Sequence, residues 1–95
     1  MLEIKHQDHD NKGEFYIGEE QHHLAEMTYS WTGTDKFIID HTWVDDALRG
    51  QNVGRKLVDA AVDFAHQRNV KILPLCPFSK SVFEKDPTIG DVLFR

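Results

Sequence analysis

The first third of the chain alternates between apolar and polar residues, which is the period of a β-strand. Three short runs carry this alternation, each bounded by turn-forming residues: 2–6, 14–20 and 23–31. The polar stretch between the first two runs predicts a loop, with turn residues at Asp10, Asn11 and Gly13. The second and third runs predict a hairpin. One face of the third run is apolar, so we expect a sheet with one covered side: Ala25, Met27, Tyr29 and Trp31.

Residues 36–44 give the clearest strand pattern in the chain. Regular alternation places four side chains on one face of this strand: Phe37, Ile39, His41 and Trp43. The opposite face also carries apolar residues, Ile38 and Val44. Apolar residues on both faces are typical of a strand in the middle of a sheet.

The spacing of apolar residues changes to that of a helix from Gly54 to about Arg68. A strand at residues 71–75 and a short helix at residues 77–85, with Pro77 at its first position, follow. Pro87 and Gly90 predict a loose tail. The strand–helix–strand unit at residues 36–75 favours a parallel pair of strands, so we expect a mixed α/β sheet with at least one helix on a face.

The chain has 95 residues and a formal net charge of -5, which favours a single domain over residues 1–95 and argues against a general nucleic-acid binder. We expect no membrane span, because no apolar run is long enough. Cys76 is the only cysteine, so the chain cannot form an internal disulfide, and we expect a cytoplasmic protein. The histidines lack metal-ligand spacing, and we expect no metal site.

The stretch "LRGQNVGRKLV", residues 48–58, joins the central strand to the first helix. Glycine and asparagine allow unusual backbone angles there, and the first N–H groups of a helix lack partners within the helix. Such an end binds phosphate through main-chain N–H groups and the helix dipole. Arg49, Arg55 and Lys56 add positive charge. The alternative from spacing alone is an ordinary strand-to-helix turn that uses glycine for its geometry.

This loop resembles the pyrophosphate loop of the GNAT superfamily of acyl-CoA N-acyltransferases, in which Arg or Gln, two residues, Gly, one residue and Gly or Ala follow one another. Arg49 and Gly54 match the two ends of that pattern, and Asn52 stands where the family usually has glycine. With "HTWV" before the loop and "PLCPF" after the helix, the chain resembles small single-domain GNAT-like proteins of the YjdJ type over residues 25 to about 87.

The resemblance implies a minimal GNAT-like fold and acetyl-CoA as co-substrate. The backbone of Trp43 and Val44 would then pair with the pantetheine arm. The loop would hold the pyrophosphate with these residues: Arg49, Gly50, Gln51, Asn52, Val53, Gly54 and Arg55. Because proline cannot complete a strand ladder, we expect the strands that hold Trp43 and Leu75 to splay at Pro74, with the thioester between them.

Two residues are candidates for catalysis. Cys76 follows the last strand and precedes a helix whose dipole favours a thiolate, so it could accept the acetyl group or protonate the leaving thiolate; the alternative is a buried structural cysteine. His41 is the candidate general base, and its alternative is a hydrogen-bonded core histidine. Glu26 and Asp40 could orient an amine or could be ordinary solvated carboxylates.

The sequence thus predicts an acetyl-CoA-dependent N-acetyltransferase acting on an unidentified amine, with a protein or peptide among the candidate acceptors. Full-size relatives have helices between the first two strands, where this chain has a short polar loop, so the acceptor site would be open. An acyl-CoA-binding module without significant turnover is the alternative, and a small structural adaptor is a third reading. We expect a monomer or a weak homodimer.

Overall fold

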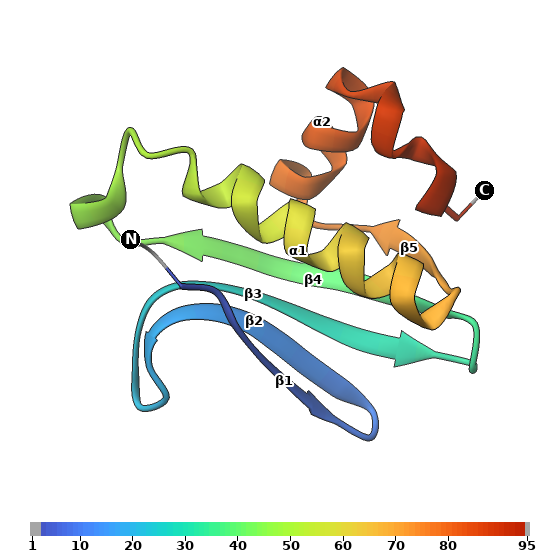
Figure 1. The fold of residues 1–95 in the computed structure, drawn as a ribbon, viewed down its shortest axis with the longest axis horizontal. Coiled ribbons are helices and arrows are strands. Elements are labelled where there is room, and N and C mark those ends of the chain that lie inside the picture. Colours follow the sequence, from blue (N-terminus) through green and yellow to red (C-terminus); the bar gives the residue numbers. More distant parts are fainter. Residues whose placement is uncertain (1–2, 95) are drawn as a thin grey trace.

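The structure, a computed structural model, describes residues 3–94, and Figure 1 shows a twisted sheet with a long helix lying across it. The sheet contains five strands that lie side by side in chain order: β1 (Lys5–His9), β2 (Lys12–Glu19), β3 (His22–Thr32), β4 (Lys36–Val44) and β5 (Lys71–Pro74). Neighbours from β1 to β4 are antiparallel, and β5 is parallel to β4. The predicted mixed α/β sheet is confirmed.

Two helices follow β4 in the chain. Helix α1 (Val53–Arg68) carries the crossover to β5, and α2 (Pro77–Lys85) begins just after β5 with proline at its start. Short 3-10 helices precede α1 and follow α2: η1 (Asp46–Leu48) and η2 (Pro87–Val92). One core joins the apolar side of α1 to the inner face of the sheet, which is the face that the helices cover. Full burial of each large apolar side chain there contributes about 1.5–3 kcal/mol.

The first strand lies later in the chain than the alternation predicted. Of the predicted strand at residues 2–6, Leu2 falls outside the described residues, and β1 runs instead from Lys5 to His9. It pairs residue by residue with β2 up to His9 and Lys12, so only a tight turn separates them. Polar residues form this strand because it lies at the edge of the sheet, mostly exposed, where backbone pairing outweighs composition.

The predicted face of His41 and Trp43 is wrong, because β4 contains a β-bulge. Tyr29 pairs with Ile39 and Thr28 with His41, so β4 has one extra residue, Asp40, against β3. An extra residue reverses the alternation beyond it. His41 and Trp43 therefore lie on the outer face of the sheet, and Thr42 and Val44 turn toward the helices, opposite the inner residues Met27 and Ala25.

The predicted separation of β4 and β5 is confirmed, but the reason given for it was wrong. Pairing of the two strands ends at Ile39 and Pro74. The N–H of Leu75 donates to Ile39 of β4, and that of Lys71 donates to Asp35, the residue just before β4. By alternation Pro74 turns its nitrogen to the free edge and interrupts no bond to β4. The strands separate because β4 bulges at Asp40 while the chain after Pro74 turns into α2.

The tail after α2 is ordered, contrary to the loose tail predicted from Pro87 and Gly90. The η2 segment leads the chain back to the free edge of β5, where Leu93 forms a parallel bridge with Ile72. The N–H of Phe94 donates to the carbonyl of Ile72 at 2.8 Å. This contact covers part of an edge that would otherwise expose unpaired backbone groups. No helix within residues 3–94 is long and apolar enough to cross a membrane.

Candidate acetyl-CoA site

The loop between β4 and α1 is anchored at its start by η1. The carboxylate of Asp45 accepts a hydrogen bond from the N–H of Ala47 at 2.8 Å, which caps this short helix. The side chain of Leu48 is buried in the core, and this packing holds the loop against the rest of the domain. The chain then passes through Gly50 and Gln51 to the first turn of α1.

The first N–H groups of α1 have no partner in the described chain. Gly50 has φ 85° and Asn52 has φ 58°, so two left-handed residues turn the backbone into the helix. The first hydrogen bond of the helix joins the N–H of Lys56 to the carbonyl of Asn52 at 3.2 Å, and Asn52 makes no side-chain cap. The N–H groups of Val53, Gly54 and Arg55 therefore remain available, as an anion site at a helix N-terminus requires.

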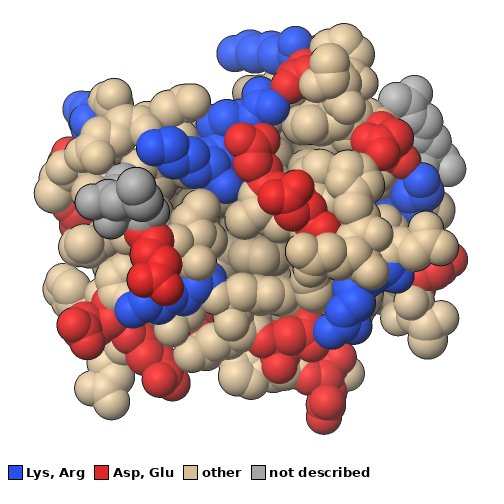
Figure 2. All heavy atoms as spheres, in the orientation of Figure 1, with Lys and Arg blue, Asp and Glu red and all other residues tan. Residues whose placement is uncertain are grey.

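The positive side chains of the loop differ in what they can offer an anion. Arg49 pairs with Asp46 at 2.7 Å, but both side chains are largely exposed, so solvent screens this pair and a ligand can compete for it. Lys56 forms no ion pair within residues 3–94. In Figure 2 acidic and basic side chains are interspersed, so the charge near the loop is local.

Arg55 is committed to a structural contact. Its guanidinium donates to Asp59 on α1 at 2.8 Å and to Asp86, at the end of α2, at 2.5 Å. Hydrogen bonds from Thr88 and from Arg55 lower the pKa of Asp86 to about 2. The side chain of Arg55 thus joins the two helices, and only its main-chain N–H faces a ligand at the loop.

A pocket of about 390 Å³ lies between this loop, the end of β4 and α2. Its floor comes from inner-face residues of β4, Thr42 and Val44, and its wall from Phe78 of α2. Gly54 lets Phe78 approach closely: a Cβ at this position would lie 2.5 Å from Cζ of Phe78, so a larger residue would displace the ring. The pocket therefore brings together the loop, the separated strand and the helix that follows Cys76.

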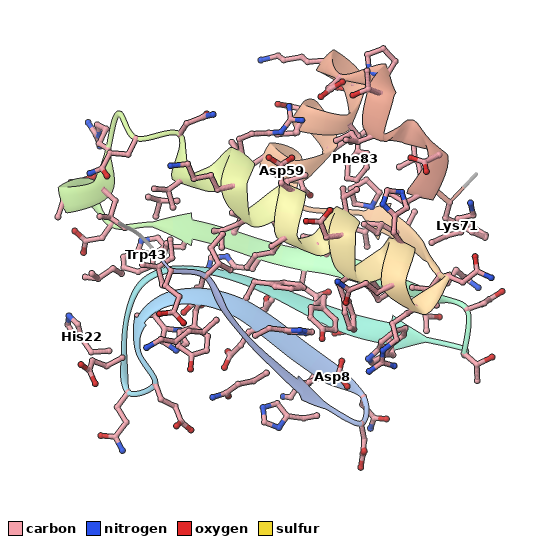
Figure 3. All side chains as sticks on the ribbon, viewed as in Figure 1. Asp8, His22, Trp43, Asp59, Lys71 and Phe83 are labelled. Carbon is pink, nitrogen blue, oxygen red and sulfur yellow. The ribbon has the colours of Figure 1, made fainter. Side chains whose placement is uncertain are left out.

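The peptide groups of β4 beyond the bulge are directed in a way that suits an extended ligand. The N–H of Asp45 donates to the carbonyl of Leu24 across the pair formed by Ala25 and Val44, so this pair does not itself exchange hydrogen bonds. The N–H and C=O of Val44 thus point away from β3, toward the gap that β5 leaves, and by alternation so do those of Thr42. Trp43 turns its peptide groups to β3 and its indole to the outer face, where it is 41% exposed at the end of β4 (Figure 3).

Cys76 lies at the inner side of the gap between β4 and β5. Its sulfur is 3.5 Å from Oγ1 of Thr42, and the residue stands directly before the first turn of α2. Burial acts to raise the pKa of the thiol, but hydrogen bonds from Thr42 and from the N–H groups of Ser79 and Phe78 outweigh it and lower the pKa. These hydrogen bonds therefore make the thiol of Cys76 more acidic than that of an ordinary cysteine.

His41 lies on the other side of the same strand. Its side chain is 55% exposed on the outer face, with Nε2 3.8 Å from Oε2 of Glu26. It is therefore no core histidine, and it does not contact Cys76, which faces the helices. Of the sequence-predicted site residues, the loop, Val44 and Cys76 come together around one pocket, and His41 and Trp43 stand on the far face of β4.

Sequence reasoning overlooked two residues of the site. Thr42 contacts the thiol and lines the pocket, but its place became visible only once the bulge had reversed the faces of β4. Phe78 forms the wall of the pocket and remains 41% exposed. The signal available in the sequence for Phe78 was its position, an aromatic residue directly after Cys76 and Pro77.

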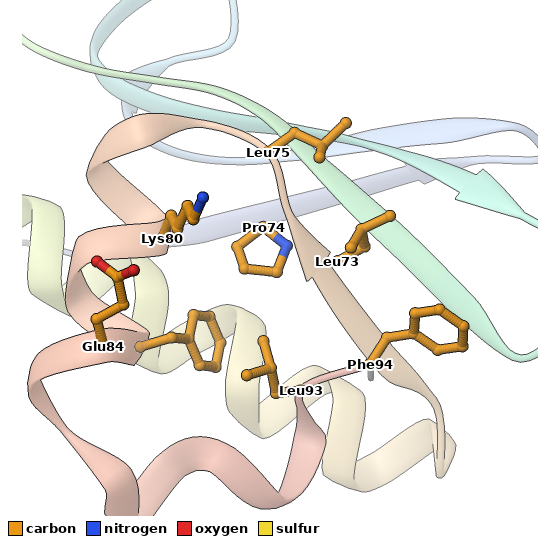
Figure 4. A pocket seen from close by; sticks show the side chains of 8 residues that line it. Leu73, Pro74, Leu75, Lys80, Glu84, Leu93 and Phe94 are labelled. Carbon is orange, nitrogen blue, oxygen red and sulfur yellow. The ribbon is translucent and has the colours of Figure 1, made fainter.

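A second hollow, of about 450 Å³, lies on the other side of β5 from the loop (Figure 4). Leu73, Pro74 and Leu75 form one wall, α2 forms another, and Phe94 closes one end. It is mainly apolar and receives no N–H groups from a helix terminus. Within the described residues, no group of three acidic, histidine or cysteine side chains could hold a metal ion.

These features define an acyl-CoA-binding fold of the GNAT class: a parallel pair of strands that separates over a helix N-terminus with available amides. The comparison with protein families agrees, since residues 14–92 match the family described as GCN5-related N-acetyl-transferase. The chain belongs to this family.

Similar proteins fit that assignment. A GCN5-like protein from Staphylococcus aureus, solved by NMR, is 46% identical, with a TM-score of 0.77 over 98% of this chain and 88% of the other. A Clostridium acetobutylicum protein crystallised with acetyl-CoA has the same fold at 18% identity, with a TM-score of 0.63 over 80% of this chain and 56% of the other. Protein NATD1 of Xenopus tropicalis is 29% identical over 66 residues, which cover 70% of this chain and 61% of that protein.

Proposed function

We propose that this protein is an acetyl-CoA-dependent N-acetyltransferase in which the diphosphate of acetyl-CoA binds the main-chain N–H groups at residues 51–55. The observation that carries the proposal is the set of N–H groups at Val53, Gly54 and Arg55, which have no partner and face one pocket. A diphosphate there would accept several hydrogen bonds and meet the positive end of the α1 dipole. Arg49, Gly50, Gln51, Asn52 and Lys56 complete the cradle.

The pantetheine arm would lie along β4 beyond the bulge, in the place that β5 leaves. The peptide groups of Val44 and Thr42 support this, because they point into the gap and can pair with the amides of the arm as a neighbouring strand would. Trp43 contributes no peptide group to this contact. Its role is confined to the outer face, where its exposed ring can border the acceptor.

The thioester would then lie beside Cys76, and the lowered pKa of the thiol favours covalent transfer over proton donation. The thiolate sulfur attacks the carbonyl carbon, a C–S bond to Cys76 forms, and the bond to the coenzyme A sulfur breaks. The released thiolate takes a proton from water. Of the N–H groups that point into the gap, that of Thr42 belongs to the residue in contact with Cys76 and would stabilise the oxyanion, while Val44 pairs with the arm.

In the second step an amine attacks the acetyl group on Cys76. The C–N bond forms, the C–S bond breaks and the thiolate of Cys76 returns, while His41 takes the proton from the amine. The amine would enter from the outer face, past the exposed ring of His41. The chain between β1 and β2 is only a tight turn, so no helix from this segment covers the acceptor side. An open acceptor site of this kind suits an amine on a protein or peptide tail.

Mass spectrometry of the intact protein tests this mechanism. After brief mixing with acetyl-CoA, the wild type should gain one acetyl group, mapped to Cys76, and should lose it when amines or peptides are added. Cys76→Ala should bind coenzyme A but gain no acetyl group, and its acetyl transfer should fall by about 10²-fold or more. Wild-type rates in Cys76→Ala would refute the covalent step, and absence of binding in calorimetry would refute the whole proposal.

The chief alternative is a module that binds acyl-CoA without useful turnover, and the open acceptor side favours it. Release of free thiol in the presence of an amine panel separates the two functions. We propose a monomer or weak homodimer. The functional thiol fits a reducing compartment such as the cytoplasm.

A further inference from the structure

The outer face of the sheet carries one carboxylate between two imidazoles. Glu26 of β3 lies with Oε1 3.0 Å from Nδ1 of His23 and with Oε2 3.8 Å from Nε2 of His41. Its register partner on β4 is Trp43. Strands β3 and β4 therefore bring together three side chains: His23 and Glu26 of β3, and His41 of β4, which is the candidate general base.

His23 is held more firmly than its place at the start of a strand would suggest. Its ring stacks on Tyr16 of β2, with centroids 4.1 Å apart and an interplanar angle of 13°. Only 13% of its side chain is exposed. The stacking keeps Nδ1 of His23 directed at Oε1 of Glu26. The hydrogen bond to Oε1 therefore holds the carboxylate and leaves Oε2 for His41.

The hydrogen bond between His23 and Glu26 also sets which nitrogen carries the proton. An ionised carboxylate only accepts hydrogen bonds, so Nδ1 of His23 must donate. Nε2 of His23 is then buried, and it has no partner within the described residues. A buried polar atom without a partner is costly and calls for an explanation. The stacking on Tyr16 and the hydrogen bond to Glu26 hold the ring in this orientation despite that cost, which leaves the second oxygen of Glu26 for His41.

Other charged groups on this face are directed elsewhere. Asp40, next to His41 in the chain, accepts a hydrogen bond from Oγ of Ser30 at 2.6 Å. Lys5, whose register partner is Tyr16, donates to the carbonyl of Gly18 at 2.8 Å. Glu26 is therefore the carboxylate that faces the ring of His41.

We propose that Glu26 is a positioning residue for His41, and that His23, held by Tyr16, positions Glu26. This inference rests on the proposed acetyl transfer with His41 as base. When Nδ1 of His41 takes the proton of the amine, the new positive charge is shared with Nε2–H, which points to Glu26. The separation of 3.8 Å is that of an ion pair and shortens to a hydrogen bond when the imidazolium forms. His41 then returns the proton to water from its exposed side.

Nuclear magnetic resonance tests the pairing without any turnover. At one fixed pH, the imidazole proton and nitrogen chemical shifts of His41 should differ between wild type and Glu26→Gln, because the ring loses the carboxylate beside Nε2. Glu26→Asp, which keeps the charge, should recover part of the difference. Glu14→Gln is the matched control: Glu14 lies on the same face, across Thr28 from His41 and about two strand spacings, roughly 10 Å, away.

Kinetics tests the catalytic part. In Glu26→Gln, kcat with an amine acceptor should fall about 10-fold, with KM for acetyl-CoA unchanged. His23→Gln should give a smaller change of the same kind. Equal imidazole chemical shifts of His41 in wild type and Glu26→Gln overturn the inference whatever the activity. If the His41 signals respond to Glu26→Gln but the wild-type protein transfers no acetyl group, the proposed function is refuted instead.

Discussion

The N–H of Cys76 donates to the carbonyl of Ile39 at 3.1 Å, and Leu75 donates to the same oxygen at 3.2 Å. This shared acceptor is the last backbone link between β4 and the segment after β5. Beyond it β4 bulges and the other chain enters α2, so the gap opens directly beside the thiol. Cys76 thus gets its place from the same hydrogen bond that ends the parallel pairing.

Alkylation should detect the lowered pKa of Cys76. Iodoacetamide reacts with the thiolate, so the rate should rise with pH at a lower pH than for an ordinary thiol, and coenzyme A should slow it. Thr42→Val removes one hydrogen bond to the sulfur and should move the rise to higher pH. Mass spectrometry as a function of pH gives the profile. A wild-type rise at the pH of an unperturbed thiol, or one unmoved in Thr42→Val, would contradict this account.

Gly54 and Phe78 should behave as a coupled pair. Elsewhere in a helix, Gly→Ala stabilises by about 0.5–1 kcal/mol, but here the new Cβ would meet the ring of Phe78. We therefore expect Gly54→Ala to lower the free energy of unfolding by about 1–2 kcal/mol and to weaken coenzyme A binding. Urea unfolding and calorimetry give the two values.

The control for this pair is the double variant Gly54→Ala with Phe78→Ala. Removal of the ring should relieve the clash, so the cost of Gly54→Ala should largely disappear in that background. Strictly additive free energies would mean that the ring does not limit the site.

Asn52 holds a left-handed conformation without a capping bond from its side chain. Asn52→Gly should keep or slightly raise stability and leave coenzyme A affinity close to that of the wild type, because glycine adopts φ 58° without strain. Asn52→Val should cost about 1–2 kcal/mol in unfolding free energy, since a β-branched residue is strained there. If Asn52→Gly lost coenzyme A affinity about 10-fold or more, the side chain itself would contact the ligand.

Deletion of Asp40 should close the gap while leaving the core in place. Without the extra residue, His41 stays on the outer face and Thr42 on the inner face, so no apolar side chain changes sides. β4 could then continue straight beside β5. We expect a folded protein by circular dichroism with coenzyme A binding weakened about 10-fold or more in calorimetry. Unchanged affinity would show that the bulge does not create the binding gap, and Asp40→Ala, which keeps the residue count, is the control.

The contact between Arg55 and Asp86 should make stability fall in acid. The folded-state pKa of Asp86, about 2, lies below its model-peptide value of 3.8, so the unfolded chain binds the proton more tightly. The stabilisation is fully present above about pH 4 and is lost as the pH falls toward 2. Urea midpoints of the wild type and Asp86→Asn should therefore differ at pH 6 and converge near pH 2. Asp63→Asn, an exposed carboxylate of α1, should follow the wild type throughout.

The sequence by itself determined the order of elements, the inner face of β3 and the position of the loop at the start of α1. These features follow from local rules: period two for strands, period 3.6 for α1, and glycine or asparagine where the backbone must turn left-handed. The same rules located the turn at Gly50 and Gly54, whereas the interpretation of Arg49 to Gly54 as a pyrophosphate loop came from the resemblance to the GNAT pattern and stays a proposal. The bounds of β1 escaped these rules, because an edge strand needs backbone partners more than an apolar face, and so did the ordered tail after α2.

Only the tertiary structure decided which side chains surround the gap. A single extra residue, Asp40, moved His41 and Trp43 to the outer face and brought Thr42 and Val44 toward the helices. A bulge depends on pairing with another strand, and no periodicity within β4 reveals it. Two ion pairs likewise depend on contacts between segments that are distant in the sequence. Arg55 pairs with Asp86, 31 positions away, and Glu26 of β3 lies beside His41 of β4. Local sequence fixes the backbone of this site, and packing between elements selects its chemistry.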